Sequence, residues 1–406
     1  MAQCLVAWPR RLLLGGRKVV MLATLVAACR TPGPQVYGEG KQDAWAAAAT
    51  TASVAPVITG SRYDFCRLSQ AAVPNFGVPE IWNAARVASE VQALRNSNGI
   101  KGSPWEAYPA IYLRMTAARD RERCAGGLHA ENQVSQLIGD RLADLMSRFY
   151  VLETRQCGSA VPPRHGSSGF CGLMQRIKAE KLDALTAAMA STAVYISSHI
   201  ALALRAVVMD DYFWNDLAAH GSGSPELAEA AHADPARARR VRLALVAQYR
   251  PEYDKFNGFL ADQIATAAGA LSEAGLLSNQ ALIVTSGLAK YVSFRSCFFR
   301  RIRDGAFDAA VQDSKELGGL NHPMMVSGPS GVVHADPSRF DFAMPSTRRL
   351  QQLEDFALAA VAGPSQRLIY QHLLGGRTWD DLERSNIIGN KDGGCTKASE
   401  RRRISR

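Results

Sequence analysis

The chain lacks the sequence patterns that identify most catalytic and metal-binding sites. It contains no Cys-x-x-Cys pair, no His-Glu-x-x-His and neither standard form of glycine-rich phosphate loop. Aromatic residues make up only 8% of the chain, whereas alanine is abundant, and this composition favours helices over sheets. The residues therefore indicate no cofactor. They are informative about the localisation and the fold of the protein.

The first thirty residues have the layout of an export signal. Four cations and no acid (Arg10, Arg11, Arg17 and Lys18) precede an apolar run from Val19 to Ala28. This run has about ten residues, too few for the ~20 that a transmembrane helix needs, and it ends on small residues. We therefore expect residues 1–28 to be a removable export signal. The paired Arg10 and Arg11 leave a twin-arginine export route open.

The segment that closes this run, Val26-Ala27-Ala28-Cys29, resembles the lipobox of bacterial lipoproteins, although that class prefers leucine where Val26 stands. The resemblance implies that Cys29 becomes the new N-terminus and carries acyl chains such as palmitate. Several chains on Cys29 would hold the protein durably on a membrane, whereas one chain binds only marginally. We expect a location in the bacterial cell envelope, on the periplasmic side of the outer membrane or the outer leaflet of the inner membrane. Ordinary secretion and an uncleaved anchor are the alternatives.

The basic character of the chain belongs to its two ends. The formal charge of +10 includes four cations in residues 1–28 and a net charge of +4 in residues 391–406, so the body carries about +2. This distribution argues against a nucleic-acid-binding face. The basic tail 391–406 is expected either to be solvated or to contact anionic lipid.

Cysteine use points to disulfide bonds. Besides Cys4 and Cys29 the chain has six cysteines, an even number that in an exported protein indicates disulfides with fifteen possible connectivities. The six candidates are Cys66, Cys124, Cys157, Cys171, Cys297 and Cys395. Only one pair can be named, Cys157 with Cys171, because both flank a Gly-, Pro- and Ser-rich loop between helical segments. Closing that loop would add about 3 kcal/mol in the chain-entropy model.

The periodicity of the body predicts a mainly α fold, a bundle-like domain of several helices over residues 61–390. A spacer over 29–60 precedes it, rich in Pro, Gly and Ala. A break near 215–235 leaves a division into two subdomains open. Residues 318–345 are rich in Gly, Pro, Ser and Asn, and we expect a long irregular loop there that can carry a short hairpin.

Two helices stand out. Between Val134 and Phe149 apolar residues recur at helical steps, which predicts a core-facing stripe or a docking face for a partner helix. The charged residues between them (Asp140, Arg141, Asp144 and Arg148) are expected to turn away from that stripe. The longest candidate runs from Leu173 to about Trp214 and is uncharged from Ala184 to Leu204. We favour a central packing helix, with His199 hydrogen-bonded in the core, over a membrane span.

One possible metal site lies at the end of this long helix. Asp210, Asp211 and Asp216 form an acidic cluster that resembles the aspartate-rich motif of terpene synthases, although the third aspartate stands too late for that family. Carboxylates grouped in this way can bind Mg²⁺. The simpler interpretation is a solvated acidic helix end beside packing aromatic residues.

One possible hydrolytic site lies in the long loop. Ser330, His322, His334 and Asp336 offer the side chains of a serine-histidine-aspartate triad, although the surrounding Ser-Gly-Pro-Ser-Gly lacks the spacing of a nucleophile elbow.

The export signal and the absence of standard catalytic motifs together give the expected function: an envelope lipoprotein that works by contact, as a scaffold or assembly component of a secretion or conjugation-type apparatus. A periplasmic hydrolase using the 318–345 loop and a metal-dependent helical enzyme are the alternatives.

Overall fold

Helices account for most of the structure, as the composition predicts. The computed structural model describes residues 57–68, 82, 84–97, 99–128, 132–157, 170–182, 184–221, 223–262, 302–317, 322–328, 331–336, 339, 341 and 346–362. All of these belong to the second of two units into which the chain divides, Val36–Arg406. The predicted signal 1–28, Cys29, most of the spacer, Ser330, Cys297, Cys395 and the basic tail 391–406 lie outside the described residues.

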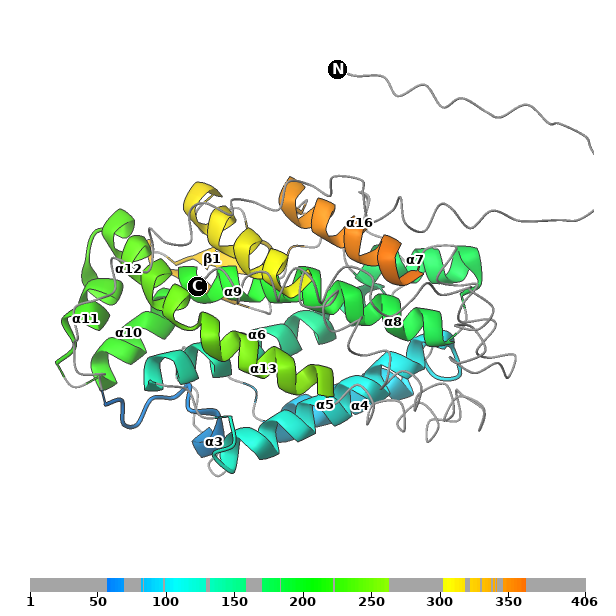
Figure 1. Ribbon diagram of the computed structural model, residues 1–406, viewed down its shortest axis with the longest axis horizontal. Helices are drawn as coiled ribbons and strands as arrows, with labels where there is room; N and C mark the ends of the chain where they lie inside the picture. The colour runs from blue at the N-terminus through cyan, green and yellow to red at the C-terminus, as the bar shows by residue number, and fades with distance from the viewer. Residues whose placement is uncertain are drawn as a thin grey trace, which may run out of the picture. The chain divides into compact units, whose positions relative to one another are not determined.

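Figure 1 shows the helical elements of the described residues in chain order by colour. They are α3 (Phe65–Leu68), α4 (Ala84–Asn96), the 3₁₀ turn η2 (Pro104–Glu106), α5 (Ala107–Cys124), α6 (Gln133–Cys157), α7 (Phe170–Glu180), α8 (Ala184–Val194), the π-helical segment η3 (Tyr195–His199), α9 (Ile200–Met209), α10 (Asp211–His220), α11 (Pro225–His232), α12 (Pro235–Gln248), α13 (Arg250–Asp262) and α16 (Arg348–Ala362). Residues 302–317 are also helical.

Helix α6 carries the apolar stripe that the sequence shows between Val134 and Phe149. Its stripe residues are buried, among them Ile138, Leu145 and Phe149, each less than 1% exposed. The helix packs against α4, α7, α9, α12 and α13, so neighbours cover it on several sides. The prediction of a core-facing helix is therefore confirmed, and α6 is a central element of the described domain.

The predicted helix from Leu173 to Trp214 is interrupted in two places. Lys181 has a left-handed backbone (φ 49°), and this separates α7 from α8. Asp210 has an extended backbone, and its side chain caps α10 by accepting a hydrogen bond from the Phe213 N–H. An aspartate at this position satisfies a free amide of the first turn, which is why the chain ends one helix and starts another there.

Between these interruptions, α8, η3 and α9 form one continuous apolar rod. The segment Thr186–Met209 is long and apolar enough to cross a membrane by length and composition, with a mean hydropathy of 1.5. However, 94% of its most apolar window is buried inside the structure, and α16 lies against α8 (Figure 1). Small residues such as Ala190 and Ala193, both fully buried, allow this close approach.

The long loop contains the short hairpin that its composition allows. Strand β1 (Met325–Ser327) pairs antiparallel with β2 (Val333–Ala335), with Val326 opposite His334. Gly331 has a positive φ of 77° in the turn between them, a conformation that glycine adopts without strain. The hairpin packs on α9 and α10.

Two disulfides join helix ends. Cys157 at the end of α6 is bonded to Cys171 in the first turn of α7, with their Cα atoms 4.9 Å apart, which confirms the pairing expected from the loop between them. Cys66 of α3 is bonded to Cys124 at the end of α5, with a Cα–Cα distance of 5.4 Å. In the chain-entropy model this longer loop adds about 4 kcal/mol.

Replacing Ala190 by leucine tests whether the apolar rod is packed inside the protein. Because Ala190 is fully buried, the larger side chain overfills the core, and Ala190→Leu should lower the free energy of unfolding by about 1–3 kcal/mol. The control Ala236→Leu, at an exposed position of α12, should change it by less than about 0.5 kcal/mol. Denaturant titration measures both. Equal, small effects would indicate that this face of the rod is not packed.

Candidate functional site

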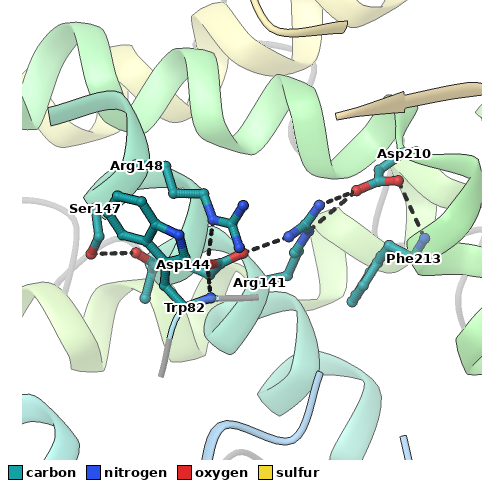
Figure 2. A network of polar contacts seen from close by, with 8 residues as sticks. Trp82, Arg141, Asp144, Ser147, Arg148, Asp210 and Phe213 are labelled. Atoms are coloured by element: carbon teal, nitrogen blue, oxygen red, sulfur yellow. Dashed lines mark hydrogen bonds and ion pairs between the residues drawn. The ribbon is translucent and has the colours of Figure 1, made fainter. Parts of the chain in front are cut away.

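The largest departure from the sequence-based expectation is a buried ion-pair network that connects α6 to α10. Arg141, in the middle of α6, lies between two carboxylates (Figure 2). Its Nη2 is 2.6 Å from Asp210 Oδ2, and its Nη1 is 2.5 Å from Asp144 Oδ2. All three side chains are at most 2% exposed. The expectation that Arg141 and Asp144 turn away from the core is therefore wrong.

Asp144 joins further parts of the chain to this network. Its Oδ1 accepts a hydrogen bond from Arg148 Nε at 2.8 Å and another from the backbone N–H of Trp82 at 3.0 Å (Figure 2). Arg148 is itself buried and lies over the Trp82 ring, 5.3 Å from its centroid. Trp82, which precedes α4, is thereby held on α6.

Asp140, the fourth charged residue expected to face solvent, is also buried. It binds Arg123 of α5 through two hydrogen bonds of 3.1 and 2.8 Å. Neighbouring helices cover α6 on several sides, so these four charged residues are enclosed, and each of them has a partner of opposite charge. This pairing agrees with the rule that buried charges must be compensated.

The electrostatic balance favours the charged form of Arg141. Burial lowers its pKa, but the carboxylates of Asp210 and Asp144 outweigh this effect, so that its pKa is raised above the ordinary value. The ring of Tyr63 covers the guanidinium at 5.0 Å. Burial, and then the charge of Asp210, raises the pKa of Tyr63, which keeps this ring neutral.

The three aspartates of the predicted metal site bind separate partners. Asp210 holds Arg141, as described above. Asp211 lies 2.7 Å from Arg242 and accepts a 2.6 Å hydrogen bond from the backbone N–H of Val333. Asp216 is bound by Ser61 Oγ at 2.6 Å and Arg62 Nε at 3.0 Å.

These carboxylates are not arranged as a shared metal site. Among the described residues, the one group of three or more potential ligand atoms within 4.8 Å of one another lies elsewhere. The interpretation as a solvated acidic helix end is also wrong for Asp210 and Asp216, since both are buried. Their positions show that they attach α10 to its surroundings.

His322, a candidate base of the predicted hydrolase, uses both ring nitrogens on the backbone. Its Nε2–H donates to the carbonyl oxygen of Leu202 at 2.8 Å, and its Nδ1 accepts from the N–H of Met324 at 3.1 Å. Burial, together with the nearby charge of Arg205, lowers the pKa of His322 to about 3. The imidazole is therefore neutral and anchors the hairpin to α9.

The other described candidates of the hydrolase lie on the hairpin. The ring of His334 packs on Tyr212 of α10, with centroids 4.5 Å apart. The Asp336 N–H donates to the carbonyl of Met324, and its carboxylate is 3.5 Å from Arg339 Nε. Both residues thus make contacts that position the loop, and Ser330 lies outside the described residues.

A group that the sequence analysis missed lies where α6 ends and α7 begins. Glu153, Cys157 and Cys171 each place one potential ligand atom within 4.8 Å of the others. Glu153 is also 2.6 Å from Nε2 of His199, in the π-helical segment. The sequence signal was the four-residue spacing of Glu153 and Cys157, which puts both on one helix face. His199 is buried and hydrogen-bonded, as predicted.

Four buried tyrosines pack together at η3, namely Tyr108, Tyr112, Tyr150 and Tyr195, the last of which belongs to η3 itself. Tyr112 packs on Tyr150 and Tyr195, with ring centroids 4.6 and 5.2 Å apart, and its hydroxyl is 2.9 Å from Ser147 Oγ. A cavity of about 20 Å³ adjoins them, lined in part by Arg119. A space of this size has room for about one water molecule.

No known protein family, curated protein or solved structure matches the chain.

Removing the imidazole of His322 should change how stability depends on pH. Because His322 is neutral when folded and titrates near pH 6.5 when unfolded, its contribution is present above pH 6.5 and is lost as pH falls toward 3. The loss has a slope of up to about 1.4 kcal/mol per pH unit. Denaturant titrations from pH 7 to 4 should show a flatter curve for His322→Gln, which keeps a donor and an acceptor. Identical slopes would contradict the buried neutral histidine.

Proposed function

We propose that this protein is an envelope lipoprotein, tethered to a membrane through acylated Cys29, that acts as a scaffold or assembly component of a secretion or conjugation-type apparatus. The lipobox-like segment before Cys29 and the basic flank of the preceding apolar run support the tether. On this proposal the spacer 29–60 separates the helical domain from the membrane, and the other partners are envelope proteins.

The disulfides are the observation that carries the proposal. Cys66–Cys124 and Cys157–Cys171 both close between helix ends within the described domain. Disulfides persist in oxidising compartments such as the bacterial periplasm and are rare in the cytosol. Two of them in one domain therefore support export, which is what the first thirty residues indicate independently.

The contacts of the candidate catalytic residues support a function through protein–protein contact, because these residues hold the fold together. Asp210, Asp211 and Asp216 each bind a different arginine, and both nitrogens of His322 are occupied by the backbone. Neither the described residues of the 318–345 loop nor the three aspartates are arranged in a way that favours a hydrolase or a metal enzyme over these structural roles. Among the described residues the exposed large hydrophobic side chains are Val57 and Leu317. A partner would therefore meet few large hydrophobic side chains there, which agrees with a non-obligate complex, whose interface is no more apolar than the rest of the protein surface.

Substitution of Cys29 tests the tether and the role together. In a Gram-negative host the protein should sediment with membranes, incorporate labelled palmitate and capture envelope proteins after cross-linking. Cys29→Ala should lose the label, because the acylated residue is missing, and it should retain residues 1–28, because Cys29 is also the residue at which the signal would be removed.

Cys4→Ala is the matched control, because Cys4 lies within the predicted signal and should leave all three results unchanged. Mass spectrometry of cytosolic protein with an intact Met1 and free thiols at Cys66 and Cys124 would contradict the proposal.

A further inference from the structure

The carboxylate of Glu153 lies beside the Cys157–Cys171 disulfide. One oxygen of Glu153 and the two sulfurs all lie within 4.8 Å of one another, and this is the only such group among the residues that the structure describes. The second disulfide, Cys66–Cys124, has no comparable group in the same part of the chain. The two disulfides thus differ in the chemistry available beside them.

Helix packing holds these three residues in place. Glu153 and Cys157 are one turn apart in the last turns of α6, and Cys171 is in the first turn of α7. Glu153 and Cys171 are buried, at 8% and 4% exposure. Because α6 and α7 pack against each other, the two cysteines would remain close if the bond between them were broken.

The π-helical segment η3 orients the carboxylate. His199 Nε2 is 2.6 Å from Glu153 Oε2, and the nitrogen donates when the carboxyl group is ionised. The His199 ring packs near Phe149 and Tyr195, with centroids 6.1 and 5.9 Å apart, which limits its rotation. A hydrogen-bonded partner of this kind fixes the direction of a metal ligand and raises metal affinity. Single π-helical turns occur frequently at functional sites.

We propose that the reduced form of this group binds a divalent metal ion of the zinc type through Cys157, Cys171 and Glu153. Two thiolates and one carboxylate form a ligand set that zinc accepts, and three protein ligands leave the fourth tetrahedral position open for water or a substrate. The oxidised form is the disulfide seen in the structure, so the same cysteines either connect α6 to α7 directly or hold a metal between them.

The disulfide form is converted to the metal-binding form by thiol–disulfide exchange with a dithiol. A dithiol reductant supplies two electrons and two protons to the Cys157–Cys171 bond, which gives two thiols and leaves the reductant as a disulfide. Binding of the metal ion then releases both protons, because the ligands are thiolates. This inference does not depend on the proposed scaffold function or on export, since it concerns the reduced chain in any compartment.

Cobalt(II) is the probe for this site, because thiolate ligands give near-ultraviolet charge-transfer absorption and a tetrahedral site gives intense visible bands. The full chain, reduced with a dithiol that is then removed under inert gas, is titrated with Co²⁺. We expect both absorptions to appear with saturation at one ion per chain. The Cys66→Ser/Cys124→Ser variant should give the same spectrum, whereas Cys157→Ser/Cys171→Ser should lose the charge-transfer bands.

Glu153→Gln separates the proposed site from two adventitious thiols. It should keep the charge-transfer bands but weaken Co²⁺ binding by at least about tenfold, and His199→Gln should weaken it by about 10–100-fold. Circular dichroism of each variant establishes that it is folded. The inference would be overturned by charge-transfer bands that persist in Cys157→Ser/Cys171→Ser, by their absence from the folded reduced chain, or by an unchanged affinity in Glu153→Gln.

Discussion

The charge of Arg141 is the constraint on which the arrangement of the central helices depends. An arginine enclosed by α6 and its neighbours must have carboxylate partners, because an unpaired charge in the core costs several kcal/mol. Asp144 supplies one partner from the same helix, and Asp210 supplies the other from the junction of α9 and α10. Apolar contacts alone tolerate small rotations and shifts of a helix, whereas these hydrogen bonds are satisfied at one placement of α10.

The same junction connects several parts of the domain. Asp210 pairs with α6 through one oxygen and caps α10 with the other. The next residue, Asp211, receives the N–H of Val333 and thereby fixes the hairpin, while Asp216 holds the segment around Ser61 and Arg62. Asp211 also pairs with Arg242 of α12, so an acidic run that resembles a metal-binding motif in the sequence attaches four separate segments to one short helix.

Much of the fold could be predicted because it follows from local patterns. Apolar periodicity indicated α6, small uncharged residues indicated the rod of α8 and α9, and turn residues around Val332 and Val333 indicated the hairpin. The exposure of Asp140, Arg141, Asp144 and Arg148 was predicted wrongly, because an amphipathic pattern assumes one buried face. Neighbours cover α6 on several sides, and which distant carboxylate would meet Arg141 is not encoded within any single helix.

The contacts of the candidate site residues were less predictable, because they too depend on segments that are far apart in the chain. The sequence places His322, His334 and Asp336 in one loop, but the hydrogen bonds of His322 depend on its position against Leu202, 120 residues away. The pairing of Cys157 with Cys171 and a buried, hydrogen-bonded His199 followed from the sequence. That His199 would meet Glu153 depended on the packing of η3 on α6.

A double-mutant cycle on Arg141 and Asp210 tests the central constraint most directly. Arg141→Met, measured by denaturant titration, should lower the free energy of unfolding by about 3–5 kcal/mol, because it leaves the buried Asp210 without its arginine. Asp210→Asn should lower it by about 1–3 kcal/mol, because Arg141 then keeps Asp144 as its one carboxylate partner. The double variant should cost much less than the sum. The exposed pair Arg237 and Glu229 is the control, and its single substitutions should change the free energy of unfolding far less than those of the buried pair. Additive effects at Arg141 and Asp210, or losses as small as those of the exposed pair, would contradict the role assigned to this interaction.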